Sequence, residues 1–254
     1  MEGEFDNWML VFLRVSAFLL VLPFFTMSNF PVTMRVAVGA IIAMLIAPVL
    51  PMFPLEDLGF LRVLGVMAQE VSVGLLLGFI ARMVFYAVDI AGSVISTEMG
   101  LNMATILDPM TQQTSQIAGT ILMFLATIVM FTLNLHDWLL LGFERTYTVL
   151  PIGGAHLNNV LFESVVATTS RVFMLAVQLS APIIAVSFVV TVVFAVLSRA
   201  VPTMNVFSEM FGFRIFGGLI VFGFTMQLTA QYVSDYLTRL PEDLLVLAQT
   251  MGGR

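Results

Sequence analysis

Five charged side chains interrupt the apolar stretches of this 254-residue chain: Arg14, Glu70, Arg82, Asp89 and Arg171. A charge at the centre of a membrane helix costs about 2.5–3.5 kcal/mol on insertion scales, so such groups usually face a protein interior or a water-filled path. Glu70 and Arg82 lie about 18 Å apart along a helix, which is too far for pairing within it. We therefore expect their partners on other helices or other chains.

Two interpretations of these charges stay open on the residues alone. In the first, Glu70 and Arg82 are relay groups of an autonomous proton-coupled secondary transporter, with a helix broken at Pro182 as its binding site. In the second, the charged side chains extend to the membrane surface or form buried structural pairs. A transporter of this type is expected to carry an internal repeat, and the sequence offers only a recurring Arg–Val dipeptide.

Most enzyme classes find no support in the sequence. The chain has ten arginines but no lysine, which removes P-loop phosphate binding and Schiff-base chemistry, and it has no cysteine. His136 and His156 do not form an HExxH motif, and no G-x-S-x-G elbow occurs. A formal net charge of −6 argues against a nucleic-acid partner. We predict a protein without catalytic residues, cofactor or metal.

The composition indicates a membrane protein, because 59% of the residues are hydrophobic and only 10% are charged. A membrane helix needs about 20 apolar residues. Six runs are long enough, and together they predict one all-α domain over residues 1–254 with broken helices. The runs are residues 8–28, 36–55, 63–88, 117–143, 165–198 and 213–233.

Prolines and polar residues mark the expected boundaries. A turn at residues 29–31 predicts that the first two runs form a hairpin, and Pro182 predicts that the fifth run is two helices or a sharply broken one. Residues 241–250 are expected to form a short separate helix that starts with Pro241. The longest polar connection covers residues 89–116, and residues 144–159 are expected to form an ordinary loop.

One segment near the C-terminus resembles a known family. Residues 195–218 read AVLSRAVPTMNVFSEMFGFRIFGG, and their R-x-x-P-x-x-N-V-F string is similar to that of the FliR family of flagellar export-gate proteins, called SctT in virulence secretion. Residues 12–39, the QEVSVGLLLG segment at 69–78 and residues 89–109 resemble the family in the same order. The family commonly has G-F-P-x-K where this chain has residues 210–214, MFGFR, so the local geometry there is expected to differ.

The resemblance implies a non-enzymatic subunit of a right-handed helical export gate. Its partners would be FliP-like and FliQ-like subunits, a FlhB-like switch protein and unfolded exported substrates, at the bacterial inner membrane in the flagellar basal body or injectisome base. It also implies that Arg14, Glu70, Arg82 and Arg171 are buried charges between subunits. Helices held within a complex, in place of ordinary spans, would tolerate such charges.

The resemblance assigns roles to two further groups of residues. A plug loop would help to close the conduit, with Met103 and Met110 as gasket residues beside it. The loop would comprise Ile106, Leu107, Asp108, Pro109, Met110, Thr111, Gln112, Gln113, Thr114, Ser115 and Gln116. A subunit-contact motif would comprise Arg199, Pro202, Asn205, Phe207 and Arg214.

Overall fold

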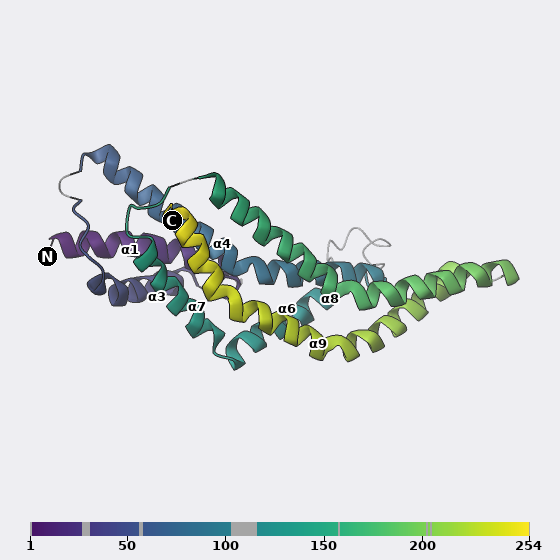
Figure 1. The fold of residues 1–254 in the computed structure, drawn as a ribbon. Helices are drawn as coiled ribbons and strands as arrows, with labels where there is room; N and C mark the ends of the chain where they lie inside the picture. Colours follow the sequence, from purple (N-terminus) through teal and green to yellow (C-terminus); the bar gives the residue numbers. More distant parts are fainter. Residues whose placement is uncertain are drawn as a thin grey trace. The chain divides into compact units, whose positions relative to one another are not determined.

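A computed structural model gives the architecture, and it describes residues 2–26, 31–55, 58–102, 116–156, 158–201, 203 and 205–253. These residues form helices and connections without any strand, which confirms the predicted all-α class (Figure 1). The helices are α1 (Glu2–Val21), α2 (Pro23–Thr26), α3 (Val32–Ile46), the 3-10 helix η1 (Ala47–Val49), α4 (Phe60–Glu98), α6 (Ile117–Thr132), α7 (Leu135–Val149), α8 (Asn159–Ala200) and α9 (Val206–Met251).

The chain forms two compact units, which we call unit 1 and unit 2. Unit 1 comprises Met1–Met83, Asn134–Thr169 and Thr238–Arg254, and unit 2 comprises Val84–Leu133 and Ser170–Leu237. The long helices α4, α8 and α9 each contribute one part to each unit. Each unit therefore has a core of its own, built from segments that are distant in the sequence.

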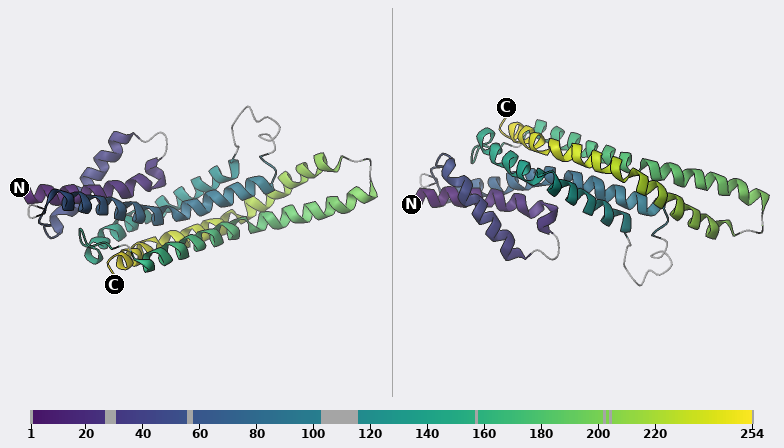
Figure 2. Two further views of the ribbon diagram at one scale, coloured as in Figure 1. Left: turned by 90° about the horizontal axis from the view of Figure 1, so that it is seen from above. Right: turned by 90° about the horizontal axis from the view of Figure 1, so that it is seen from below.

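In unit 1, α1 packs against α3, which confirms the predicted opening hairpin (Figure 2). Prolines 48, 51 and 54 follow this second helix, and the α-helical part of it ends at Ile46. Phe18 of α1 stacks on Phe143 of α7 with ring centroids 4.4 Å apart, and both side chains are buried. The core of unit 1 thus joins the opening hairpin to a helix that comes more than a hundred residues later.

In unit 2, α8 and α9 run side by side as a long hairpin in both views of Figure 2. Phe194 of α8 contacts Phe213 of α9 with ring centroids 5.2 Å apart. Gly92 of α4 lies against Gly119 of α6, so closely that a Cβ atom on Gly92 would clash with the backbone of α6. Glycines at this contact permit close helix packing.

The predicted break at Pro182 does not occur, because α8 is continuous for 42 residues with Pro182 inside it. Proline removes one N–H group from the ladder, and the many remaining backbone hydrogen bonds keep the helix intact. A 42-residue helix is about 63 Å long, roughly twice the thickness of a hydrocarbon core.

A break occurs instead within the predicted run 117–143. Helix α6 ends at Thr132 and α7 begins at Leu135. Between them Asn134 adopts a left-handed conformation with φ of 52°, the one positive φ of a non-glycine residue in the described part of the chain. Asparagine tolerates this conformation better than most residues because its short polar side chain bonds locally.

Three other boundaries differ from the predicted ones. Residues 89–98 continue α4 and are not part of a connection, and residues 144–149 belong to α7. Helix α9 continues through Pro241 to Met251, so the C-terminal segment is not a separate helix. Pro241 packs against Gly142 of α7, where a Cβ atom would lie 2.9 Å from the proline Cβ. The proline is half-buried in this contact, and the helix continues past it.

Four helices in the described ranges are long and apolar enough to cross a membrane, or five if α6 and α7 count as one broken span. The four are Val32–Val49, Phe60–Glu98, Asn159–Ala200 and Ser208–Met251. Six had been expected. The predicted run 8–28 is not among them, because α1 ends at Val21 and carries three acidic residues and Arg14. Helices α6 and α7 are each too short to cross a membrane alone.

Candidate functional site

The centre of unit 1 holds a fully buried ion pair between Arg14 of α1 and Glu70 of α4. The Arg14 Nε donates to Glu70 Oε2 at 2.5 Å and the Nη2 donates to Oε1 at 3.0 Å. Both residues have an exposed fraction of 0%. Two parallel N–H···O bonds of this kind fix direction as well as distance.

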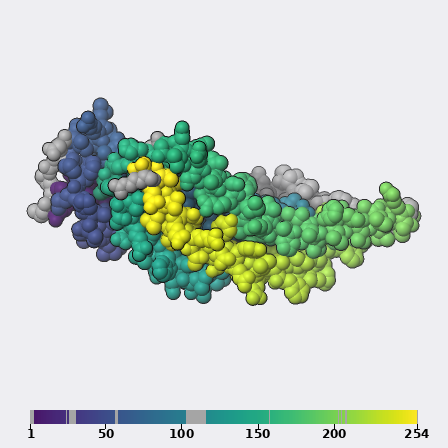
Figure 3. All heavy atoms as spheres, viewed as in Figure 1, coloured from purple at the N-terminus to yellow at the C-terminus, as the bar shows by residue number. Residues whose placement is uncertain are grey.

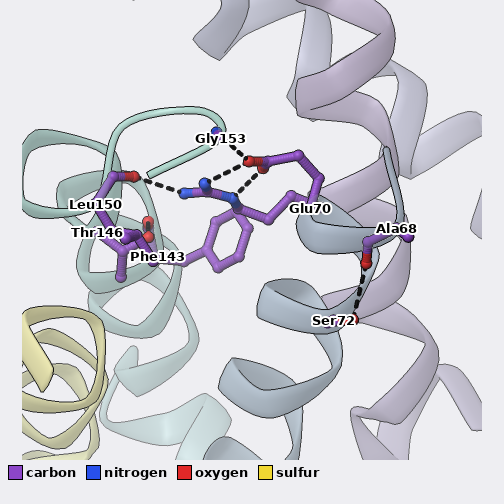
Figure 4. A network of polar contacts seen from close by, with 8 residues as sticks. Ala68, Glu70, Ser72, Phe143, Thr146, Leu150 and Gly153 are labelled. Atoms are coloured by element: carbon purple, nitrogen blue, oxygen red, sulfur yellow. Dashed lines mark hydrogen bonds and ion pairs between the residues drawn. The ribbon is translucent and has the colours of Figure 1, made fainter. Parts of the chain in front are cut away.

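The connection after α7 completes this network (Figure 4). Arg14 Nη1 donates to the Leu150 carbonyl at 3.1 Å, and the Gly153 N–H donates to Glu70 Oε1 at 3.0 Å. The Tyr147 ring lies 4.2 Å below the guanidinium carbon, a cation–π contact. The predicted ordinary loop is therefore a partner of the buried charges, and Gly153 with φ of +72° provides a backbone shape that favours glycine.

Glycines of α4 bring the two charges together. A Cβ atom on Gly74 would overlap the Arg14 carbonyl oxygen and lie 2.8 Å from the Ala17 Cβ, and one on Gly78 would lie 2.8 Å from the Phe18 carbonyl oxygen. Gly74 and Gly78 are four residues apart on α4, and the residues that they contact on α1, Arg14 and Phe18, are also four residues apart. Glu70 is one turn before Gly74, so this register places its carboxylate beside Arg14.

The structure brings together Arg14 and Glu70, two of the four charges predicted to lie between subunits. Arg14 and Glu70 bind each other within the chain. Arg82 is half-buried and donates from Nη1 to the Val21 carbonyl at 3.2 Å. Arg171 is exposed on this chain, and its carbonyl oxygen accepts from the Tyr236 hydroxyl at 3.4 Å.

Unit 2 contains a second polar network, which we call the α8 ladder: Glu98, Ser187, Thr191 and Arg214. The Ser187 hydroxyl donates to Glu98 Oε2 at 2.6 Å, and Arg214 Nη2 donates to Thr191 Oγ1 at 2.6 Å. The Thr191 hydroxyl also donates to the Ser187 carbonyl at 2.7 Å. The sequence showed Ser187 and Thr191 one turn apart in an apolar run, a signal that our sequence interpretation missed.

Helix α4 ends directly after Glu98 in a Schellman motif. The Leu101 N–H donates to the Ser96 carbonyl at 2.9 Å, and the Gly100 N–H donates to the Thr97 carbonyl at 3.0 Å. Gly100 has φ of +75°, and a Cβ atom there would lie 2.6 Å from the Phe211 ring. This end of α4 is therefore capped by its own backbone and packed against α9.

Several predicted site residues fall outside the described part of the chain. These are Ile106 to Ser115 of the plug loop, Met103, and Pro202 of the contact motif. Gln116 is exposed and precedes α6, where its carbonyl accepts from the Thr120 N–H at 2.9 Å. The Phe207 side chain also lies outside the described part, although its backbone belongs to α9.

The rest of the contact motif is spread along the α8–α9 connection. Arg199 and Asn205 are exposed. The Asn205 Oδ1 accepts from the Ser208 N–H at 3.4 Å, the position of an N-cap at the start of α9. Arg214 is half-buried and belongs to the α8 ladder. Among the described residues no group of three or more His, Cys, Asp or Glu side chains is placed to hold a metal ion.

The chain matches a family model over most of its length. The family is described as bacterial export proteins, family 1, and the match covers residues 5–240. The flagellar biosynthetic protein FliR of Bacillus subtilis is 32% identical over 206 residues, which cover 80% of this chain and 79% of the relative. The protein of the same name from Escherichia coli is 29% identical over 228 residues, 90% of this chain and 87% of the relative.

Proposed function

The chain belongs to family 1 of the bacterial export proteins, and we propose that it is a non-enzymatic subunit of the flagellar protein export gate. With FliP-like and FliQ-like subunits it forms the conduit through which unfolded proteins leave the cell, and a FlhB-like switch protein binds the assembly. Residues 106–116 form a plug that helps to close this conduit. The complex lies in the bacterial inner membrane at the core of the flagellar basal body.

The extent of the similarity carries this proposal. Relatives named flagellar biosynthetic protein FliR align with 90% of this chain in Escherichia coli and with 78% in Caulobacter vibrioides. The family match over residues 5–240 includes most of both units and most of the long helices α4, α8 and α9. A match confined to one apolar helix would reflect composition alone, whereas a match of this length includes the turns and polar networks.

The surface of unit 2 supports an assembly partner. Large apolar side chains of α8 and α9 lie at the surface, and Figure 3 shows both helices there. Extended exposed apolar surface requires lipid or protein cover. The side chains are Phe188, Val189, Val193, Val196, Phe213, Phe216 and Phe224. We propose that a partner subunit covers part of this surface and that lipid covers the rest.

The state of Glu70 favours a gate subunit over an autonomous transporter. A proton-relay carboxylate must meet water or substrate during its cycle. Glu70 has an exposed fraction of 0%, and its two oxygens accept three hydrogen bonds from Arg14 and Gly153. Arg82 donates to the Val21 backbone carbonyl. These contacts favour a structural role for Glu70 over a role in proton transfer.

The plug role can be tested on the assembled complex. We expect that deletion of residues 111–116 leaves assembly with the FliP-like and FliQ-like subunits intact and raises the leak of a small dye from proteoliposomes. The matched control replaces the same six residues with a Gly-Ser segment of equal length, which retains the bulk of the loop and should leak less. An assembled deletion variant that is as tight as the wild type would contradict the plug role.

A further inference from the structure

We propose that the α8 ladder, residues Glu98, Ser187, Thr191 and Arg214, positions the end of α4 and thereby sets where the chain leaves the helix toward the plug. These are positioning residues, since they act through the helix end. The proposal rests on the proposed function. It goes beyond the proposed function because it assigns a role to residues at the end of α4 and on α8 and α9, none of which belongs to the plug.

The ladder joins three helices through one turn of α8. Ser187 and Thr191 are four residues apart and therefore lie on the same face of α8. One hydroxyl bonds the carboxylate of Glu98 on α4, and the other bonds the guanidinium of Arg214 on α9, each at 2.6 Å. Since the Thr191 hydroxyl also donates to the Ser187 carbonyl, the two ends of the ladder share one turn.

The surroundings make these bonds directional. Ser187 has an exposed fraction of 4%, so its hydroxyl has little access to water as an alternative partner. A hydrogen bond to an ionised group in such surroundings is stronger than a neutral one, and leaving a buried partner unsatisfied is costly. Sliding α4 by one turn against α8 would move Glu98 beyond reach of Ser187. The bond therefore selects one register of the two helices.

The same helix end is held by two further contacts with α9. The buried Met99 side chain fills the space beside Gly218, where a Cβ atom would lie 2.6 Å from its Cγ. The next residue, Gly100, packs on the Phe211 ring. Glu98, Met99 and Gly100 are consecutive, so a hydrogen bond, a packed side chain and a left-handed backbone fix the exit point together.

The test compares single hydroxyl deletions in the complete complex. Ser187→Ala removes the bond to Glu98 and adds no bulk. Ser180→Ala is the matched control, because Ser180 is also a buried serine of α8 and donates only within its own helix. Both variants are co-produced with the FliP-like and FliQ-like subunits, purified as the complex and reconstituted into phosphatidylethanolamine–phosphatidylglycerol vesicles that contain a self-quenched dye.

We expect Ser187→Ala to raise dye leak about tenfold, the factor that corresponds to a hydrogen bond to a charged group. Ser180→Ala should leak like the wild type. A double variant, Glu98→Leu with Ser187→Ala, separates positioning from stability. It leaves neither partner unsatisfied and should restore assembly yield if the single variant lowers it. The register is still unspecified in the double variant, so its leak should stay high.

Three outcomes would overturn the proposal without contradicting the plug role. The first is a Ser187→Ala complex that is as tight as the wild type while the 111–116 deletion leaks, a result that leaves the plug role intact. The second is a double variant whose dye leak equals that of the wild type, which would show that the ladder contributes to stability alone. The third is an equal leak in Ser180→Ala and Ser187→Ala. If instead the deletion itself does not leak, the proposed plug fails, and with it the ladder's role.

Discussion

The two polar networks solve the problem of charge among apolar helices in opposite ways. In unit 1, Arg14 and Glu70 are both completely buried and neutralise each other, with backbone groups at Leu150 and Gly153 completing the set. In unit 2, Glu98 and Arg214 are half-buried, and each binds a neutral hydroxyl of α8. The first arrangement depends on every member. The second can lose a member at lower cost, because its charges retain partial contact with their surroundings.

The largest expected effect follows from removing half of the buried pair. Glu70→Ala leaves the Arg14 guanidinium charged and without its carboxylate in a site that excludes water. Loss of one partner of a buried ion pair typically costs about 3–5 kcal/mol. We expect the purified complex with this variant to lose its resistance to proteolysis at a clearly lower denaturant concentration in detergent than the wild type does.

A double replacement tests whether the charge itself is the cause. Arg14→Met with Glu70→Leu removes both charges and keeps most of the volume, and replacements of this kind are often neutral or stabilising by about 1–4 kcal/mol. The double variant should therefore be more stable than Glu70→Ala alone. Equal instability of the two variants would show that packing volume matters more than charge, and the contrast between the networks would weaken.

A smaller loss is expected from Gly74→Ala, which disturbs the geometry of the pair without touching its charges. The new methyl group would overlap the Arg14 carbonyl and push α1 away from α4. Forcing extra volume into a packed core typically costs about 1–3 kcal/mol. This loss of stability can be measured by thermal unfolding of the complex. The control is Gly65→Ala, at a glycine of the same helix with no neighbour in that direction, and it should be neutral or slightly stabilising.

Gly100→Ala probes the helix end next to the α8 ladder. The left-handed backbone disfavours a β-carbon by about 1–2 kcal/mol, and the Phe211 ring must also shift. Gly100→Asn should have a smaller backbone cost because asparagine accepts this conformation more readily. Dye leak of the assembled complex should follow the same order. A Gly100→Ala complex that is stable and tight would show that the cap has no influence on the exit of the chain.

The smallest effect is expected for Arg214→Met, which removes the charge at the other end of the ladder. Thr191 keeps its bond to the Ser187 carbonyl, and methionine replaces much of the apolar stem of arginine. Because Arg214 is half-buried and retains contact with its surroundings, we expect a loss of about 1 kcal/mol, below the range for a buried hydrogen bond to a charged group. Thermal unfolding side by side with Arg14→Met gives the comparison directly. A larger loss for Arg214→Met would reverse the ranking of the two networks.

Local patterns in the sequence predicted the helical class, the opening hairpin and the presence of partners for the buried charges. They did not predict which residues would pair. Arg14 and Glu70 are 56 residues apart and the Leu150 carbonyl is 136 residues from Arg14. Nothing in the composition of the connection after α7 distinguishes a backbone carbonyl that binds an arginine from one that binds water.

The positions of the helix breaks also could not be predicted from local sequence patterns. Pro182 is the strongest local signal for a break, yet α8 is continuous there, whereas the interruption occurs at Asn134 within an apolar run. A proline removes one hydrogen bond, a cost that a long helix with packed neighbours can offset. The turn at Asn134 is selected by packing of Leu135, Leu139 and Phe143 in the core of unit 1, and that packing involves residues far away in the sequence.

The glycines that bring α4 against α1 have a consequence at the level of the gene. Every amino acid that a single base change can put in place of glycine has a Cβ atom. At Gly74 and Gly78 that atom would meet the backbone of α1 before any difference between side chains mattered. No missense step at these two codons is sterically neutral, so a lineage cannot explore this helix contact gradually. A smaller residue at Ala17 would remove only the overlap with its own Cβ atom, because the Arg14 carbonyl oxygen belongs to the backbone of α1. Variation at Gly74 therefore requires α1 itself to move away from α4.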